Sequence, residues 1–289
     1  MNTLLKHPLL TLLLLAVPLA ASAQNADSLR IVNARWQTDT LDGMLLKQHH
    51  FSRKNCMGSN QFVAYIEIPP DSPRRLAFSH TPQRTPTSRH AQSHNALAAI
   101  NGSFFDMRYH NPICYLRIDG REVGINTPQA VDSIHRKYYQ YATLLLDEGR
   151  PRFVVPDSAR LAERTLEASD VMTAGPMLVR NGSLVPMRTD KTFVTDRHNR
   201  TAVGLCSDGR VLLVVVDGRT RQSEGLSLTD FSRLLRYLGC VQAINLDGGG
   251  STTLYVKGYP HQGLVNHPSD NGRYDFEGER TVSNCIIVK

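Results

Sequence analysis

The sequence feature that most constrains the fold is a run of three glycines, Gly248, Gly249 and Gly250, between two apolar segments. Residues 241–246 are typical of a short buried strand, and residues 252–256 are β-branched and aromatic, as in a second strand. Inside a regular element each glycine would cost roughly 0.5–1 kcal/mol. The run therefore predicts a loop between two strands, where the backbone turns sharply or approaches another group closely.

This loop differs from the familiar nucleotide-binding loops. A P-loop continues with Gly-Lys-Ser/Thr into a helix, and a dinucleotide-binding loop also opens a helix, whereas a strand is predicted after Ser251. A tight bend would explain the glycines alone. Asp247 at the strand end and Ser251 after the glycines instead favour a polar site, and successive N–H groups in such a turn can hold an anion.

The first 23 residues have the pattern of a secretory signal peptide. Lys6 lies in the short basic start, residues 9–20 are apolar, and Ala-Ser-Ala at 21–23 is a cleavage site before Gln24. The apolar run is too short for a typical membrane span, and Gln24 is not the cysteine of a lipoprotein anchor. We expect an exported chain, periplasmic or secreted, without a membrane span.

Composition narrows the classes of partner. The net charge of +7, with no basic run, favours anionic ligands and gives no support to nucleic-acid binding. The five cysteines form no C-x-x-C pair, so we expect no structural zinc site. Three of them lie in or beside apolar runs and are expected to be small buried residues: Cys206, Cys240 and Cys285.

The strand patterns outnumber the helix patterns and do not alternate regularly with them. This predicts an α+β fold with a mixed β-sheet core and a few helices packed on its faces. After the signal peptide at 1–23 we expect a small N-terminal β region at 24–60 and one main domain at 61–289. Residues 281–288 predict the final strand.

The helix predictions fall in three places. Residues 228–238 have a helical apolar face between an N-cap at Ser227 and a stop at Gly239. Residues 88–99 and 158–168 predict short helices, and residues 79–88 a loop. The first short helix carries His90 and His94 at i, i+4 spacing, which suits two metal ligands, but a solvated helix face explains the pair better because the remaining ligands are missing.

A hairpin is predicted from residues 201–206 and 211–216 around Ser-Asp-Gly. Antiparallel pairing would bring Arg200, at the start of one strand, next to Asp217 and Arg219, at the end of the other. Two arginines at one sheet edge can grip a phosphate in bidentate fashion. The alternative is a surface Arg–Asp pair.

The segment Asn-Gly-Ser-Phe-Phe at 101–105 follows another small apolar run. One interpretation is that Asn101 projects its amide into a cleft walled by an aromatic ring. The other is a plain Asn-Gly turn that sends Phe104 and Phe105 into the core, and at least one of them is expected there.

Six motifs in order resemble those of the phosphodiester glycosidase family, from about residue 62 to the C-terminus. They are Asn-Gly-Ser-Phe-Phe at 101–105, Ala-Gly-Pro at 174–176, Arg-Thr-Ala-Val-Gly at 200–204, Asp-Gly-Arg at 217–219, Asn-Leu-Asp-Gly-Gly-Gly-Ser at 245–251 and Glu-Arg at 279–280. The resemblance implies one catalytic domain at 61–289. It also implies a hydrolase that cuts the bond between the anomeric carbon of an N-acetylglucosamine-like sugar and a phosphate, which stays on the aglycone.

The resemblance also implies roles for particular residues. Because phosphate is already a reasonable leaving group, the site needs cations and N–H donors near it and a carboxylate at the sugar carbon. We expect the catalytic carboxylate to be Asp247, with Asp217 and Glu279 as further candidates. The substrate- and phosphate-binding candidates are Asn101, Arg200, Arg219, Gly248, Gly249, Gly250 and Ser251.

No cofactor is required for this chemistry, but two other classes of function stay open. One is a non-catalytic protein that binds an exopolysaccharide or a sugar phosphate in the same pocket. The other is a metal-dependent phosphodiesterase, in which Asp106, Asp217 and Asp247 would hold a calcium or magnesium ion through oxygen ligands. In every case the expected partner is a small-molecule or glycan sugar phosphodiester, with no nucleic acid.

Overall fold

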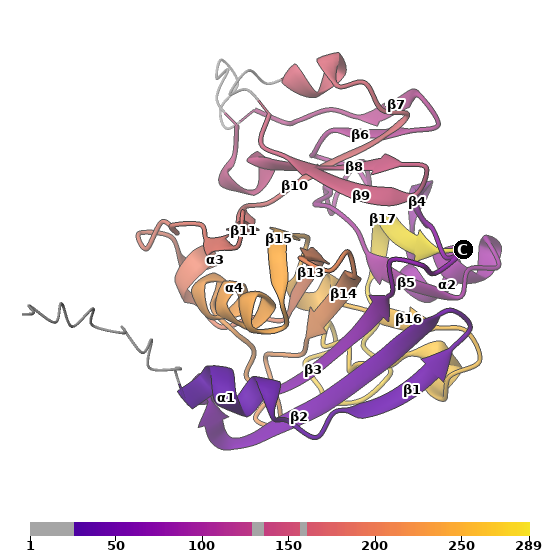
Figure 1. Cartoon of the computed structure of the whole chain (residues 1–289). Helices are drawn as coiled ribbons and strands as arrows, with labels where there is room; N and C mark the ends of the chain where they lie inside the picture. Colours follow the sequence, from indigo (N-terminus) through magenta and orange to yellow (C-terminus); the bar gives the residue numbers. More distant parts are fainter. Residues whose placement is uncertain (1–25, 129–135, 157–160) are drawn as a thin grey trace, which may run out of the picture.

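The structure is a computed structural model that describes residues 26–128, 136–156 and 161–289. The predicted signal peptide at 1–23 lies outside these residues. The strands form three antiparallel sheets of eight, five and four strands that pack around a common core (Figure 1). Helices are short and lie on the outside of the sheets.

The largest sheet carries the glycine loop and most of the candidate site residues. Its strands are, in spatial order, β1 (Gln37–Leu41), β2 (Met44–Cys56), β3 (Ser59–Ile68), β14 (Val211–Val216), β13 (Arg200–Cys206), β15 (Cys240–Asn245), β11 (Met177–Arg180) and β12 (Ser183–Leu184). Helices α1 (Ala26–Val32) and α4 (Leu228–Tyr237) cover one face of it (Figure 1). Helix α4 starts at Ser227, whose hydroxyl accepts the Asp230 N–H at 3.0 Å, as the N-cap pattern predicts.

The two smaller sheets complete the core. The five-stranded sheet has the order β7 (Arg121–Gly124), β6 (Leu116–Ile118), β10 (Asp170–Ala174), β8 (Ala142–Asp147) and β9 (Arg150–Val154). The four-stranded sheet has the order β16 (Leu254–Val256), β5 (Ala98–Asn101), β17 (Thr281–Val288) and β4 (Leu76–Pro86), with α2 (Thr87–Ser93) against it. The remaining short elements are α3 (Thr192–Thr195) and the 3₁₀ turns at Tyr138–Gln140, Ala162–Thr165, Gly249–Ser251 and His261–Gly263.

The core lies where the three sheets meet. Fully buried apolar side chains come from each of them, such as Ile66 of the eight-stranded, Leu144 of the five-stranded and Ile286 of the four-stranded sheet. Burying one such side chain stabilises the fold by about 1.5–3 kcal/mol. The ends of β5 and β15 lie beside the start of β13, since Ala202 pairs with Asn245 and Thr201 Oγ1 donates to Asn101 Oδ1.

Several sequence predictions are confirmed. The fold is α+β with helices on the faces of a β-rich core, the final strand is β17, and β13 pairs with β14 as a hairpin. The ladders between described strands are all antiparallel, which is more uniform than the mixed sheet that we expected. All five cysteines are buried and unpaired.

Other predictions are wrong. Residues 79–88 are not a loop, because β4 extends to Pro86 in a ladder with β17 and α2 begins at Thr87. The two prolines are tolerated because the ladder shifts register around Pro82, and Pro86 is the last residue of the strand. The predicted helix at 158–168 is reduced to the 3₁₀ turn at Ala162–Thr165 within the described residues, and 157–160 lie outside them. His90 is not on a solvated helix face: it is fully buried, and its Nδ1 lies 2.8 Å from Ser79 Oγ.

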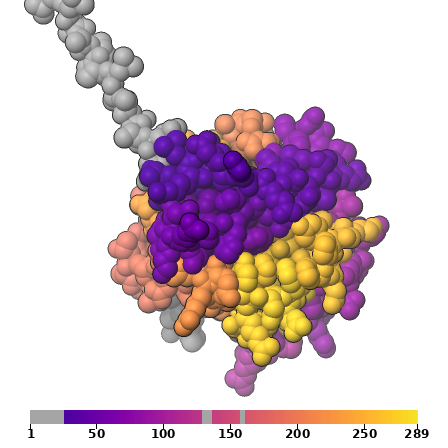
Figure 2. Space-filling view, turned by 90° about the horizontal axis from the view of Figure 1, so that it is seen from below, coloured from indigo at the N-terminus to yellow at the C-terminus, as the bar shows by residue number. Residues whose placement is uncertain are grey.

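The N-terminal β region at 24–60 is continuous with the rest of the chain. A boundary at residue 60 would cut the hairpin of β2 and β3, whose register runs from Leu45 opposite Glu67 to Cys56 opposite Ser59. Figure 2 shows this N-terminal part lying side by side with the C-terminal part on one face of the molecule. Rings from the two parts contact each other, with His50 at 6.2 Å from Tyr274 between ring centroids. Among the described residues, no helix has the length and apolar character to cross a membrane.

Candidate active site

The glycine loop connects β15 of the eight-stranded sheet to β16 of the four-stranded sheet, so it spans the junction between the two. Its start is tied to the end of β5: Asn101 Nδ2 donates to the Asp247 carbonyl at 2.7 Å, and the Asp247 N–H donates to the Gly102 carbonyl at 3.1 Å. These bonds hold the Asp247 backbone in one place. The loop joins two strands, as predicted.

The Asp247 carboxylate has an environment that suits acid–base or nucleophilic chemistry. Burial is the main cause that raises its pKa from the usual 3.8 to about 6. The Ser251 hydroxyl, the Gly248 N–H, Arg280 and Arg219 oppose this shift only in part. A carboxylate that titrates this close to neutrality is a candidate for a functional group.

Two guanidinium groups lie against the glycines of the loop. A Cβ at Gly249 would lie 2.6 Å from Arg219 Nη2, and a Cβ at Gly250 would lie 2.5 Å from Arg280 Nη2. Both distances are shorter than real Cβ contacts, so a larger residue at either position would displace the guanidinium group, and at Gly250 also the Asp270 carboxylate. Gly249 has a φ of 60° as well, so the turn and the close packing both favour glycine in this loop.

The two arginines are held differently. Arg219 is exposed, has a φ of 65° and makes no hydrogen bond or ion pair with the described residues. Such a backbone conformation in a residue other than glycine stores strain and is often found at functional sites. Arg280 is fixed by Asp270, whose Oδ1 accepts from Arg280 Nε at 2.9 Å. Arg219 is thus a cation available to a ligand, and Arg280 a cation already in position.

The loop amides are less available than the sequence suggested. The Gly248 N–H donates to Asp247 Oδ1 at 2.9 Å, and the Gly249 N–H donates to the Asn199 carbonyl at 3.0 Å. Of the three glycine amides expected to bind phosphate, only that of Gly250 is left. Ser251 Oγ is buried and makes no hydrogen bond of ordinary geometry with the described residues, although it is close enough to Asp247 to favour the ionised carboxylate.

Arg200 does not form the expected two-arginine grip with Arg219. It is buried, and its Nε donates to the Leu226 carbonyl at 2.9 Å, while Nη2 donates to the carbonyls of Phe193 and Asp196 at 3.1 and 2.8 Å. Burial lowers its pKa to about 10. Only Nη1 lacks a hydrogen-bond acceptor among the described residues. Most of the guanidinium therefore holds the segment before β13 against the segment before α4.

Asp217 is also an internal residue. Its side chain is 1% exposed, and Oδ1 accepts from Asn266 Nδ2 at 2.8 Å. Oδ2 accepts from the His267 N–H and lies 2.9 Å from His267 Nδ1. Both oxygens are therefore engaged, which leaves the carboxylate to position Asn266 and His267 instead of reacting.

Glu279 and Asn101 have structural partners as well. Glu279 accepts from the Ser88 N–H at 2.8 Å and from Ser88 Oγ at 2.6 Å, so it caps the first turn of α2. Besides the bond to Asp247, Asn101 accepts at Oδ1 from Thr201 Oγ1 at 2.9 Å and from the Thr253 N–H at 3.2 Å. The expectation that the Asn101 amide projects into a cleft is wrong, because this side chain is buried with both ends occupied.

An aromatic wall stands beside the site. Phe105 enters the core, as expected of at least one of the pair, whereas Phe104 stacks on Tyr139 with ring centroids 4.5 Å apart. The centroid of Phe193 lies 6.1 Å from that of Phe104, and the Arg200 guanidinium lies 5.7 Å from the Phe193 ring. Burial raises the Tyr139 pKa, and the charge of Asp247 adds to the shift, which places Tyr139 near this carboxylate.

The described residues do not form the three-aspartate site that we expected for a calcium or magnesium ion. They contain no group of three or more His, Cys, Asp or Glu side chains placed to bind a metal. Asp106 is turned to its own backbone and accepts the N–H groups of Arg108 and Tyr109 at 2.7 and 2.8 Å. With Asp217 also engaged, the three aspartates proposed as ligands do not form one site.

The family model for phosphodiester glycosidase matches residues 94–289. The chain belongs to the phosphodiester glycosidase family. The mouse protein named N-acetylglucosamine-1-phosphodiester alpha-N-acetylglucosaminidase is 37% identical over 125 residues, which cover 38% of this chain and 23% of the mouse chain. The alignment therefore spans about a quarter of the length of that relative.

Solved structures support the fold. The catalytic domain of the zebrafish N-acetylglucosamine-1-phosphodiester alpha-N-acetylglucosaminidase aligns with a TM-score of 0.63 at 18% identity, covering 88% of this chain and 87% of that chain. A hypothetical protein from Synechocystis aligns with a TM-score of 0.61 at 17% identity, covering 88% of this chain and 63% of that one.

Three residues were missed by the sequence reasoning: Arg280 and Tyr139 beside the site, and His267, the partner of Asp217. Of the Glu-Arg pair before β17, the acid was chosen, but Glu279 bonds Ser88, and it is Arg280 that reaches the loop. His267 and Tyr139 lie in stretches with no periodic pattern. The asparagine before His267 and the aromatic cluster around Tyr139 carry no local signal of a partner far along the chain.

Proposed function

We propose that this protein hydrolyses the glycosidic bond of a sugar-1-phosphodiester, releasing an N-acetylglucosamine-like sugar and leaving the phosphate on the aglycone. The observation that carries the proposal is the Asp247 carboxylate, with its pKa raised to about 6, beside Arg219 and Arg280, whose guanidinium groups lie against Gly249 and Gly250. The mouse and zebrafish relatives are named for this activity.

Each part of the site has a task in this reaction. Arg219 and Arg280 bind the phosphodiester and stabilise the negative charge that grows on the departing phosphate, and the Gly250 N–H and Arg200 Nη1 are the remaining donors. Asp247, in its ionised form, acts on the sugar carbon, either as nucleophile or as the base for water. The stacked rings of Phe104 and Tyr139 give the substrate an aromatic wall beside this carboxylate.

The balance of the step is simple. The anomeric C–O bond breaks, and its electron pair leaves with the bridging oxygen on the phosphate monoester. The hydroxyl of one water joins the anomeric carbon, and its proton passes to Asp247 and then to solvent. Since a phosphate monoester is a stable anion, the arginines replace the general acid that an ordinary glycosidase needs.

The test is direct. We would incubate the mature chain with an N-acetylglucosamine-1-phosphate ethyl diester, and follow free sugar and ethyl phosphate by mass spectrometry, with and without a chelator. We expect both products in equal amounts, at the same rate in the two conditions. Saturable binding without product would instead favour the non-catalytic binding protein, and loss of turnover on chelation the metal-dependent phosphodiesterase.

We also propose that the chain acts outside the cytoplasm. The support is the basic start, apolar stretch and Ala-Ser-Ala of residues 1–23. The test is to measure the intact mass of the protein recovered from the culture medium and the periplasm, and to compare it with the mass of the full chain. Cleavage after Ala23 is the expected result, and an intact N-terminus in the cytoplasmic fraction would contradict it.

A further inference from the structure

A separate pocket opens beside the aromatic wall of the site. Its volume is about 310 Å³, and no acidic residue is among the described residues that line it. The lining is aromatic and basic: Arg136, Lys137, Tyr138, Tyr139, Tyr141, Arg188, Lys191, Thr192 and Phe193. We call this the basic pocket. Nothing in the role given above to Asp247 and its arginines uses it.

The basic pocket is continuous with the active site through two shared rings. The Asp247 N–H donates to the Gly102 carbonyl, and Phe104, two residues further on, stacks on Tyr139, which lines the pocket. Phe193 also lines the pocket, and its ring centroid lies 5.7 Å from the Arg200 guanidinium. A ligand bound at Asp247 can therefore extend past these rings into the pocket.

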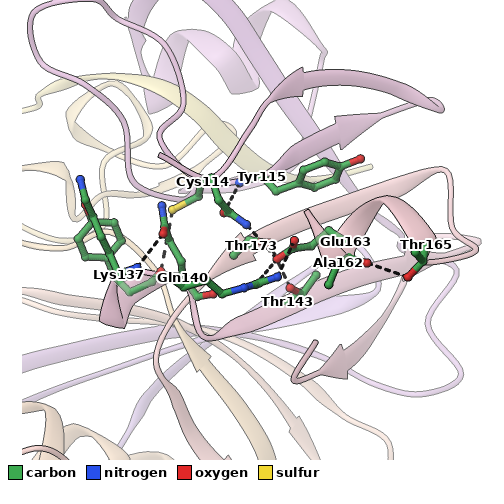
Figure 3. A network of polar contacts seen from close by, with 12 residues as sticks. Cys114, Tyr115, Lys137, Gln140, Thr143, Ala162, Glu163, Thr165 and Thr173 are labelled. Carbon is green, nitrogen blue, oxygen red and sulfur yellow. Dashed lines mark hydrogen bonds and ion pairs between the residues drawn. The ribbon is translucent and has the colours of Figure 1, made fainter. Parts of the chain in front are cut away.

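The wall of the pocket is built on a buried ion pair. Arg136 is 3% exposed and donates through Nη2 to Glu163 Oε2 at 2.9 Å, while Thr173 Oγ1 donates to Glu163 Oε1 at 2.8 Å. Figure 3 shows Lys137 and Gln140 at one end of this network, with Glu163 facing Thr143 and Thr173. The pair anchors the turn at Tyr138–Gln140 to the five-stranded sheet, so the pocket wall is fixed before a ligand arrives.

The charge at the rim is not balanced. Glu163 neutralises Arg136, but the Lys137 side chain makes no ion pair with the described residues and lies over the Tyr139 ring, with Nζ 5.8 Å from the centroid. Arg188 and Lys191 share one carboxylate, Asp190, with contacts of 3.1 and 3.3 Å. The arginine and lysine side chains are 59% and 53% exposed. Because exposed ion pairs contribute only about 0–1 kcal/mol, an anionic ligand can replace Asp190 as their partner. Three cations around one acid make a positive rim on an aromatic floor.

We propose that the basic pocket binds a second anionic group of the substrate, carried by the aglycone beyond the scissile phosphodiester. This rests on the proposed function, in which the released N-acetylglucosamine-like sugar is neutral, so that a further negative charge belongs to the phosphate-bearing side. The preferred substrates are then polyanionic, such as a sugar phosphodiester whose alcohol carries another phosphate or a repeating glycosyl phosphate.

The experiment compares three substrates that differ only in the alcohol. These are the N-acetylglucosamine-1-phosphate diesters of ethanol, of 2-phosphoethanol and of 6-phosphohexanol. The last two carry a second phosphate on a short and on a long spacer, to cover two distances from the site to the pocket. The readout is the preference, the ratio of kcat/KM for a doubly charged substrate to that for the ethyl diester. The variant Arg188→Gln/Lys191→Gln is compared with Arg53→Gln/Lys257→Gln, which removes the same charge from exposed positions outside the pocket.

For at least one spacer we expect the wild type to prefer the doubly charged substrate, and the preference to fall about tenfold in the pocket variant. The control variant should keep the wild-type preference. Equal kcat/KM for all three substrates, or an equal loss of preference in both variants, would overturn the proposal.

If no substrate is turned over, it is the proposed function that fails, and binding measured by calorimetry still decides the pocket. Tighter binding of a doubly charged diester that is weakened in Arg188→Gln/Lys191→Gln supports it. The same affinity for all three diesters overturns it.

Discussion

Two Asp-Gly turns of this molecule differ in how many hydrogen bonds the fold makes to their carboxylates. Asp217 comes directly after β14, Asp247 comes two residues after β15, and both precede a glycine. Asp217 is buried with both oxygens engaged by Asn266 and His267. Asp247 is only partly enclosed and has one backbone donor, the Gly248 N–H.

The difference teaches which carboxylate is able to react. A buried carboxylate whose hydrogen-bonding capacity is filled is a positioning group, because using it would leave its partners unsatisfied. A carboxylate whose pKa is raised toward 7, with cations close by, can exchange a proton near neutral pH and can also contact a ligand. The same contrast separates Arg200, which is tied to three carbonyls, from Arg219.

The largest effect should come from Asp247→Asn. We expect kcat/KM for the ethyl diester to fall by about three to four orders of magnitude, because the group that acts on the sugar carbon is lost. The fold should be kept, as judged by thermal unfolding. The matched control is Asp147→Asn, an exposed aspartate at the end of β8, and near-normal turnover in Asp247→Asn would remove this residue from the mechanism.

The next largest effects should distinguish Arg219, which acts on the substrate, from Arg200, which supports the fold. Arg219→Gln should lower kcat/KM by about ten- to a hundredfold through the lost charge-assisted bonds to phosphate, with stability within about 0.5 kcal/mol of the wild type. Arg200→Gln should instead lower stability, since buried carbonyls lose their donor. Steady-state kinetics and urea unfolding on both variants check this. Equal losses of stability would show that exposure does not separate their roles.

A smaller effect on activity is expected from Asp217→Asn. It should destabilise the fold by about 1–3 kcal/mol, because the N–H and ring nitrogen of His267 lose a charged partner in a buried place. Turnover at a temperature where the variant is folded should fall less than tenfold. Urea unfolding and kinetics on the same samples would expose the opposite outcome, a stable but inactive variant.

The smallest effect concerns pH. Since the ionised form of Asp247 is the reactive one, kcat/KM should fall on the acid side with a midpoint near pH 6. Arg219→Gln should move this midpoint upward, because the Arg219 charge lowers the Asp247 pKa. A midpoint that stays in place in this variant would mean that another group controls the profile.

The raised pKa of Asp247 also makes the stability of the fold depend on pH. Folding favours protonated Asp247, so its contribution is fully present below about pH 4 and is lost as the pH rises through about 6. The thermal midpoint of Asp247→Asn relative to the wild type should therefore rise between these values. A constant difference between the two proteins would contradict the shift.

The features that could be predicted from the sequence are those that depend on residues close together in the chain. The apolar runs gave the strands before and after the glycine loop, Ser227 gave the start of α4, and the short Ser-Asp-Gly turn gave the hairpin that places Arg200 beside Asp217. The order of the motifs was enough to identify the family. Each of these signals is contained in fewer than about twenty residues.

What the sequence left open depends on partners far along the chain. Asn101, Glu279 and Asp217 are polar residues in motifs, and nothing local shows that Asp247, Ser88 and His267 will occupy their hydrogen-bonding groups. The same holds for β4, whose prolines suggest a loop until β17 lies beside it. Burial and pairing across the fold, not residue type, decide whether a polar side chain reacts or supports.

The most direct test of the central claim, that the site acts on the sugar carbon, is hydrolysis of the ethyl diester in oxygen-18 water with mass analysis of the ethyl phosphate. The phosphate is the readout because a free sugar exchanges its anomeric oxygen with water. We predict unlabelled ethyl phosphate, which means that the C–O bond of the sugar was cut. Oxygen-18 in the ethyl phosphate would mean attack at phosphorus and would contradict the role given to Asp247.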